Sequence, residues 1–452
     1  MAHHDQRVPD ASAADAGRSR PQSDSLAETT GEMDRLGVVG LGYVGLPLAL
    51  AAHHAGYDVV GVDVDGEKIE RLRNGTSAVT DVSDGAVAEA VEADLEFTTE
   101  YGALADVDGV SICVPTPLRK TDSPDLSFVL DAATKLAPVV PAGCTVILES
   151  TVYPGATEEV VGEALADNGA TVGEDVFLAF SPERIDPGNE EYGPTDIPKV
   201  LGGVTRACGD RAEALYGPVF DEIVRVDTAT EAELVKLLEN TFRAVNIGLI
   251  NELAQVAHEL DVDIWSAIDA AETKPFGFMP FYPGPGLGGH CIPIDPFYLS
   301  WKASEHGIDT RFIDLADTVN REMPDHVVRR VVEQLNHRGT PLSGADVLVV
   351  GAAYKPDVSD TRESPTIDIL GQFAEWDASV SYHDPHVPSL VVGGDTYESV
   401  PLTRSRLAAA DCVVLVTNHS AVDVERILDH ASFVFDTRNA LPDSDAEHVV
   451  HL

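Results

Sequence analysis

The chain has 452 residues, and its 76 acidic residues against 30 basic ones give a formal net charge of −46. One hydrophobic core does not extend over this length, so two or three domains are expected. The acidic residues are spread along the whole chain, which argues against a nucleic-acid partner and favours a solvated surface adapted to very high salt over an acidic partner surface.

Composition and cysteine spacing argue against further classes of protein. No stretch reaches the roughly 18 consecutive apolar residues that a membrane span needs, and residues 1–33 lack the apolar region of a signal peptide. We interpret residues 1–33 as a disordered acidic extension and expect a cytoplasmic protein. The five cysteines form no C-x-x-C pair, so neither a disulfide scaffold nor a metal site is predicted.

Short apolar runs then alternate with amphipathic stretches. Strands are predicted at residues 36–39, 58–62, 109–114, 145–149 and 176–180. A helix is predicted at residues 44–54, between the first two strands. This alternation indicates a doubly wound parallel sheet with helices on both faces.

A helical stretch follows, and the alternation then restarts. Residues 232–260 have apolar residues at helical spacing, as one long helix or two abutting ones, and helical pattern continues to about residue 336. Later segments predict a second, smaller parallel sheet: strands at 347–350, 379–383, 412–417 and 433–436, and a helix at 366–373. The expected fold class is α/β, with two Rossmann-like doubly wound parallel sheets (domains 34–228 and 338–452) joined by a central helical domain (229–337).

A Gly-x-Gly-x-x-Gly loop lies between the first predicted strand and helix. Gly40 allows a tight turn, Gly42 lets the backbone approach a pyrophosphate, and Gly45 lets the helix pack close to the strand. The helix N-terminus favours the anion. Asp63, 18 residues after Gly45, is expected to accept hydrogen bonds from ribose hydroxyls and to repel a 2′-phosphate, which favours NAD over NADP.

Polar turns follow two neighbouring predicted strands. Val114-Pro-Thr-Pro117 and Glu149-Ser-Thr151 come at the carboxyl edge of the sheet, where open sheets bind ligands. We therefore extend the predicted cofactor site to these turns and to the rest of the glycine loop. The added residues are Tyr43, Val44, Pro115, Thr116 and Thr151.

Cys291 is the one cysteine in an unusual setting, while the other four are expected to be packing residues. The segment before it is rich in Gly and Pro, which predicts a shaped loop with exposed backbone N–H groups. A thiol there can act as a nucleophile towards a carbonyl carbon. Asp295 is placed to orient a water or a proton relay, and His290 is either a base or a side chain that points elsewhere.

Lys236 and Asn240 are four residues apart, and so lie on one face of the long predicted helix. A solvated helix face is one interpretation. The other is a position near the core, since both residues lie among apolar positions and lysine is scarce in this chain.

Taken in this order, the motifs resemble the UDP-glucose/GDP-mannose dehydrogenase family, from about residue 36 to the C-terminus. The resemblance rests on Gly40–Gly45, Val114–Pro117, Glu149–Thr151, Ser181–Glu183, Pro198-Lys199, Lys236 with Asn240, Gly284–Cys291 with Asp295, Tyr354–Pro356 and Asp360–Ser364. It implies an N-terminal NAD-binding domain, a central helical domain that forms homodimers, and a C-terminal UDP-binding domain.

The resemblance also implies a mechanism. The C6 hydroxyl of a UDP-sugar loses a hydride to NAD, and Cys291 captures the aldehyde as a thiohemiacetal. A second NAD takes another hydride and leaves a thioester, which water hydrolyses. Lys236 and Asn240 stabilise oxyanions, and Asp295 acts with Thr151 and Glu183 on water and protons.

Substrate and cofactor contacts are implied at further positions. Arg362 matches a family arginine that reaches NAD across the domain cleft, and Lys355 matches a residue that contacts the nucleotide. The expected substrate-binding residues are Glu183, Arg184, Lys236, Asn240, Arg243, Gly288 and Lys355. For Arg243 the alternative is a solvent-facing arginine on the helix.

Two departures bear on the sugar. Members that use UDP-glucose read Gly-Gly-Ser-Cys and then Phe-Pro-Lys-Asp, whereas here His290 precedes Cys291 and Ile294 stands at the lysine position. This form resembles the branch acting on N-acetylated sugars, and it favours UDP-N-acetylglucosamine over UDP-N-acetylmannosamine and UDP-glucose. Two other classes stay open: a catalytically silent dinucleotide-binding protein, and a two-electron hydroxyacid dehydrogenase, which would release one NADH per substrate.

Overall fold

The computed structural model describes residues 33–79, 82–119, 121, 123–184, 195–289, 292–441 and 446–452. The extension predicted at 1–33 lies outside these residues except for Met33. The described residues form two units. We call the described residues from Met33 to Glu239 with Ile294–Asp309 the N-terminal unit, and those of Asn240–Pro293 with Thr310–Leu452 the C-terminal unit. The three domain bounds given above stay a prediction.

The N-terminal unit is built on an eight-stranded sheet with the order β3-β2-β1-β4-β5-β6-β7-β8. Neighbouring strands are parallel except β6 and β7, which are antiparallel. The expectation of a doubly wound parallel sheet is confirmed, with this one reversed pair added. The strands are β1 Arg35–Val39, β2 Asp58–Val62, β3 Glu96–Thr98, β4 Gly109–Ile112, β5 Thr145–Leu148, β6 Phe177–Phe180, β7 Lys199–Gly203 and β8 Ile223–Val226.

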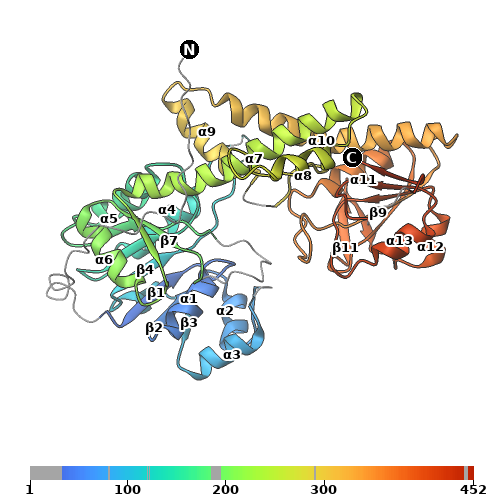
Figure 1. Cartoon of the computed structure of the whole chain (residues 1–452). Helices are drawn as coiled ribbons and strands as arrows, with labels where there is room; N and C mark the ends of the chain where they lie inside the picture. Colours follow the sequence, from blue (N-terminus) through green and yellow to red (C-terminus); the bar gives the residue numbers. More distant parts are fainter. Residues whose placement is uncertain are drawn as a thin grey trace, which may run out of the picture. The chain divides into compact units, whose positions relative to one another are not determined.

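Helices cover both faces of this sheet, which is why its central strands are almost continuously apolar. One face packs against α1, α2, α3 and α6, and the other against α4, η2, α5, α9 and the start of α7 (Figure 1). The bounds are α1 Gly45–His54, α2 Gly66–Arg73, α3 Asp84–Glu92, the 3-10 turn η1 Tyr101–Leu104, α4 Ser127–Leu136, the π-helical turn η2 Thr157–Gly162, α5 Glu163–Asp167, α6 Arg206–Tyr216, α7 Ala229–Glu259 and α9 Asp295–Glu305.

The long helix α7 is a single helix, and its residues are divided between the two units after Glu239. Its first turns are attached to the N-terminal unit through the buried Glu233. The Glu233 carboxylate accepts hydrogen bonds from the Thr157 N–H (2.8 Å) and the Thr157 hydroxyl (2.6 Å) at the start of η2. Burial raises the pKa of Glu233 to about 7. This attachment fixes the rotation of the helix that carries Lys236.

The C-terminal unit contains a five-stranded, wholly parallel sheet with the order β10-β9-β13-β14-β15. α10, α11 and the β11–β12 hairpin cover one face, and α12 and α13 cover the other (Figure 1). The bounds are α8 Ile264–Glu272, α10 Arg311–His337, β9 Asp346–Val350, α11 Pro365–Glu375, β10 Ser379–His383, β11 Ser389–Val392, β12 Asp395–Glu398, α12 Arg404–Ala409, β13 Cys412–Leu415, α13 Val424–His430, β14 Val434–Asp436 and β15 Val449–His451.

Some boundaries differ from the sequence prediction. The strands predicted at 109–114 and 145–149 end at Ile112 and Leu148, so the polar turns after them lie fully in loops at the sheet edge. The β11–β12 hairpin was missed, although its turn contains Gly393 and Gly394, both at positive φ. The four cysteines expected to be packing residues are buried, as predicted. Among the described residues no helix is long and apolar enough to cross a membrane.

Candidate active site

The glycine loop between β1 and α1 is shaped by two close backbone approaches. A Cβ at Gly40, where φ is +91°, would lie 2.5 Å from the Cys113 carbonyl oxygen. A Cβ at Gly45 would lie 1.8 Å from the Gly40 carbonyl oxygen, so neither position accepts a side chain. A Cβ at Gly42 would meet open space, which is the room a pyrophosphate needs beside this loop. Next along the chain, Tyr43 is exposed.

Asp63 ties the glycine loop to the end of β2. Its Oδ2 accepts hydrogen bonds from the Leu41 N–H (2.8 Å) and from Lys68 Nζ (2.8 Å), and its Oδ1 accepts one from the Asp65 N–H (3.0 Å). Each carboxylate oxygen can accept more than one hydrogen bond, so ribose hydroxyls fit the same group. Lys68 was not predicted from the sequence. The one available signal was its position in α2, the helix that follows Asp63.

The loops after β4 and β5 meet at the carboxyl edge of the sheet. The Ser150 hydroxyl donates to the Val114 carbonyl (2.7 Å), and the Tyr298 hydroxyl donates to the Thr116 carbonyl (2.8 Å). Tyr298 lies in α9, which begins at the buried Asp295, so this helix returns Asp295 to the N-terminal unit. Thr151, directly after Ser150, is half-buried.

Among the other predicted cofactor residues, Pro115 is exposed and Val44, just before α1, is half-buried. The predicted cofactor residues of the N-terminal unit therefore lie in the loops that follow β1, β2, β4 and β5, except Gly45, which begins α1. This is the edge at which open parallel sheets bind ligands. Tyr298 was not predicted, because nothing near it in the sequence indicates its contact with Thr116.

A buried cluster of charges lies at the same edge, after β5 and β6 and at the start of β7. Lys199, the first residue of β7, places Nζ 2.7 Å from Glu149 Oε2 and 3.1 Å from Glu183 Oε2. Burial alone would lower the pKa of Lys199, but the two carboxylates outweigh it and the pKa is raised. Burial raises the pKa of Glu149, against the lowering effect of Lys199. Lys199 and Glu149 contributed to the family resemblance, but the sequence assigned neither a role.

Three of the predicted catalytic and substrate residues lie on α7. Lys236 and Asn240 are half-buried, four residues apart, and Arg243 is exposed. Arg184 is held beside this helix, because its Nη2 lies 2.6 Å from Glu239 Oε1 and its Nη1 donates to the Pro198 carbonyl (2.8 Å). The structure thus brings Arg184 next to the helix that carries Lys236.

The glycine-rich segment before Cys291 is clamped within the C-terminal unit. The Gly284 N–H donates to Asn251 Oδ1 (2.9 Å), and Asn251 in turn donates to Asn320 Oδ1 (2.9 Å). Asn251 and Asn320 lie in α7 and α10, so the segment is anchored on two helices. Sequence reasoning missed both asparagines, since their partners are distant in the chain. Cys291 and His290 themselves lie outside the described residues.

The end of this segment packs on the loop after β9. A Cβ at Gly288 would lie 2.6 Å from the Tyr354 Cβ, and one at Gly289, where φ is +83°, would lie 2.7 Å from the Tyr354 ring. The Gly289 N–H also donates to the Arg362 carbonyl (3.0 Å). These glycines therefore let the segment before Cys291 contact the segment that carries Lys355.

Lys355 and Arg362 lie in that same segment, between β9 and α11. Lys355 is half-buried, and Arg362 is exposed and pairs with Asp360, its Nη2 2.6 Å from Asp360 Oδ2. The two residues therefore share a loop, as the motif order predicted, with the Gly289 contact beside them.

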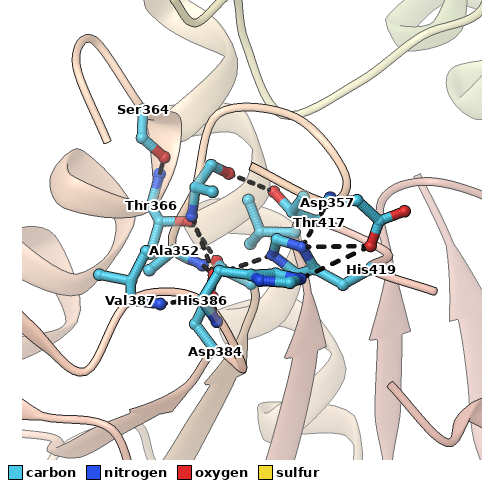
Figure 2. A network of polar contacts seen from close by, with 12 residues as sticks. Ala352, Asp357, Ser364, Thr366, Asp384, His386, Val387, Thr417 and His419 are labelled. Atoms are coloured by element: carbon cyan, nitrogen blue, oxygen red, sulfur yellow. Dashed lines mark hydrogen bonds and ion pairs between the residues drawn. The ribbon is translucent and has the colours of Figure 1, made fainter. Parts of the chain in front are cut away.

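Figure 2 shows the polar network that holds this loop on the sheet. Asp384, directly after β10, accepts hydrogen bonds at Oδ2 from the Ala352 N–H (2.6 Å) and from His419 Nε2 (2.9 Å). Its Oδ1 accepts from the N–H groups of His386 and Val387. Burial alone would raise the pKa of Asp384, but these donors outweigh it and hold the pKa well below its usual range.

Asp357, His386 and His419 each place one possible metal-ligand atom within 4.8 Å of the others. No metal site was predicted from the sequence. Two of these atoms already have protein partners: His419 Nδ1 accepts a hydrogen bond from the Asp357 N–H (2.9 Å), and Asp357 Oδ1 accepts from both the N–H and the hydroxyl of Ser420 (2.9 Å each). The contacts that the structure shows therefore indicate a structural role for this group.

Comparison with known proteins gives family matches along most of the chain. Three models of the UDP-glucose/GDP-mannose dehydrogenase family match in order: the NAD binding domain at residues 34–220, the central domain at 230–322 and the UDP binding domain at 348–443. These matches contain the glycine loop, the Lys236–Asn240 helix and the Tyr354–Arg362 loop respectively.

Individual relatives agree with the family matches. A UDP-N-acetyl-D-mannosamine dehydrogenase of Methanococcus maripaludis is 32% identical over 427 residues, which cover 91% of this chain and 94% of that protein. A UDP-N-acetyl-D-glucosamine 6-dehydrogenase of Pseudomonas aeruginosa is 36% identical, covering 85% and 90%. The solved structure of a UDP-N-acetylmannosamine dehydrogenase from Pyrococcus horikoshii superposes with a TM-score of 0.83 at 32% identity, covering 92% and 98%.

The clamp on the Cys291 loop can be tested with two alanine substitutions. Gly289 and Gly339 both have positive φ, so both Gly289→Ala and Gly339→Ala carry the same kind of backbone cost, but only the Gly289 Cβ meets the Tyr354 ring. We expect Gly289→Ala to lower kcat at least about tenfold. Displacement of the loop needs to raise the activation free energy by only roughly 1.4 kcal/mol to have this effect. Gly339→Ala should keep kcat near the wild-type value. Equal kcat losses in steady-state assays of the two variants would contradict the clamp.

Proposed function

Because this chain belongs to the UDP-glucose/GDP-mannose dehydrogenase family and is an NAD-dependent UDP-sugar dehydrogenase, we propose that it oxidises the C6 alcohol of a UDP-hexose to the carboxylate, with Cys291 as covalent nucleophile. The observation that carries this proposal is the clamped glycine segment before Cys291, where Gly288 and Gly289 leave no room for a side chain against Tyr354. A scaffold that only bound a dinucleotide would not need this loop.

The residues of the N-terminal unit fit NAD. We propose that the pyrophosphate lies over Gly40, Gly42 and Gly45, and that Asp63 accepts ribose hydroxyls next to Lys68. When bound, NAD accepts the hydride in each of two oxidation steps. We assign the further contacts to Tyr43, Val44, Pro115, Thr116, Thr151 and Arg362.

We propose the following division of work among the side chains. The Cys291 thiolate adds to the C6 aldehyde, and the C–S bond formed is kept until water cleaves the thioester. Lys236 and Asn240, which share a face of α7, donate to the oxygen that becomes negative at each addition. Thr151 orients the water on which Asp295 and Glu183 act.

Substrate contacts are proposed on both units. In the N-terminal unit we assign Glu183 and Arg184; Arg184 lies beside α7 and would exchange its Glu239 partner for the substrate. In the C-terminal unit, Lys355 contacts the nucleotide and Gly288 the sugar, since both border the Tyr354 loop. Arg243, exposed on α7, completes the set.

We propose UDP-N-acetylglucosamine as the first substrate to test. The sequence Gly288-Gly-His-Cys291 followed by Ile294 supports an N-acetylated sugar, and the Pseudomonas aeruginosa relative acts on that sugar according to its name. UDP-N-acetylmannosamine is the second candidate, because the Methanococcus and Pyrococcus relatives are named for it. UDP-glucose is the third, because the family name includes that sugar.

We also propose a homodimer through α7, because an apolar stripe runs along its exposed face. The members recur every three, four or seven residues: Leu234, Leu238, Phe242, Leu249, Leu253 and Val256, continued by Leu260 directly after the helix. Leu253→Glu should turn a dimer into a monomer in sedimentation velocity. Val391→Glu, which places the same charge on an exposed position of β11, should leave the dimer intact. A monomeric wild-type protein would refute the dimer.

The covalent route is tested by counting NADH. In molar KCl, with UDP-glucose, UDP-N-acetylglucosamine and UDP-N-acetylmannosamine tried in turn, we expect two NADH per molecule of the accepted sugar. One NADH per sugar indicates the two-electron alternative, and none with any sugar indicates a silent binding protein. Cys291→Ser should stop acid formation, because an alcohol cannot form the thioester. Acid production at the wild-type rate in this variant would refute Cys291 as nucleophile.

A further inference from the structure

The buried Lys199 lies between two carboxylates that differ in their access to solvent. The Glu149 side chain has no exposed surface and the Lys199 side chain is 5% exposed, whereas the Glu183 side chain is 14% exposed. Glu183 is therefore the carboxylate of this pair that keeps an exposed surface, whereas Glu149 is fully buried. The ring of Phe220 also faces Lys199 Nζ, 5.0 Å from the ring centroid.

Glu149 fixes the ammonium from the interior. Its carboxylate accepts a short hydrogen bond from the Tyr216 hydroxyl, which also lies 2.7 Å from the Ser111 hydroxyl. Tyr216 comes from α6 and Ser111 from β4, so the chain of contacts crosses the core of the N-terminal unit. A buried charge held by several partners is fixed in position. Lys199 Nζ is therefore a fixed cation next to Glu183.

The surrounding groups decide whether the ionised or the protonated form of the Glu183 carboxyl group is favoured. Lys199 and the Arg184 N–H, which donates to Glu183 Oε1 (2.7 Å), stabilise the carboxylate. The Glu149 charge opposes it. Cys113 also faces the cluster, but burial, followed by Glu149, raises the pKa of its thiol well above the usual value, so it stays neutral. Tyr216 stays neutral for the same reasons, with its pKa raised by burial and by Glu149.

We propose that Lys199 is a positioning residue that keeps Glu183 ionised and ready to accept a proton during thioester hydrolysis. This rests on the proposed function of Glu183. The oxygen of water attacks the thioester carbon, one of its protons passes to Glu183, and the C–S bond breaks to release the acid and the Cys291 thiolate. Lys199 keeps its proton throughout.

Two variants should shift the pH profile in opposite directions. Glu149→Gln keeps the acceptor for Tyr216 but removes the negative charge that opposes Glu183, so the acid limb of kcat should move to lower pH. Lys199→Met combined with Glu149→Gln removes the cation without leaving Glu149 charged in the core. Its acid limb should move up by about 1 to 3 pH units, with little change in KM.

Lys135→Met is the matched control, because Lys135 forms an exposed ion pair with Asp131 on α4. Loss of this surface charge should leave the acid limb in place. An unmoved acid limb in Glu149→Gln, or a shift in the same direction in both Glu149 variants, would overturn the proposal. If the double variant fails to unfold cooperatively, Glu149→Gln alone decides.

Different results contradict the proposed function and the role of Lys199. A wild-type enzyme that does not release two NADH per sugar contradicts the proposed function. A wild-type enzyme that does, but whose Glu149→Gln variant keeps the wild-type acid limb, contradicts only the role of Lys199.

Discussion

Each of the two parallel sheets depends on an aspartate placed directly after its second strand. In the N-terminal unit the first strand β1 pairs with β2, and Asp63 follows β2; in the C-terminal unit β9 pairs with β10, and Asp384 follows β10. Both carboxylates accept backbone N–H groups from the loop after the first strand: Leu41 for Asp63, and Ala352 and Ala353 for Asp384. A charged acceptor makes such bonds strong, so this one interaction shapes the ligand edge of both sheets.

The two aspartates differ in what else they bind, and this difference separates the sheets in function. The Asp384 side chain has no exposed surface, since His419 and the N–H groups of His386 and Val387 occupy it. The Asp63 side chain keeps 7% exposure beside Lys68 and below a glycine loop with open space. Asp63 therefore keeps some surface for a ligand, whereas the acceptor atoms of Asp384 are fully used within the protein. The second sheet instead presents the Tyr354–Arg362 loop, which contacts the glycine segment before Cys291.

Features with local causes could be predicted from the sequence. The strand–glycine–helix pattern, the long α7 and the restart of alternation at β9 follow from periodicity and turn residues that are close in the chain. The contacts that position the candidate residues within each unit are not local. Asn251 meets Gly284 and Asn320, and Lys199 meets Glu149, 50 residues away. The residue types give no sign of such pairs, because only the packed sheet and helices bring them together. The nucleophilic role of Cys291 was predicted from its loop and from the resemblance, the oxyanion roles of Lys236 and Asn240 from the resemblance alone, and all of them stay predictions.

Two sheets of similar design should therefore bind two different ligands, and calorimetric titration tests this directly. NADH titrated into the full chain should bind with one molecule per chain, both alone and with saturating UDP. UDP should likewise bind once per chain in the presence of saturating NADH. Two NADH molecules per chain, or displacement of NADH by UDP, would contradict the account.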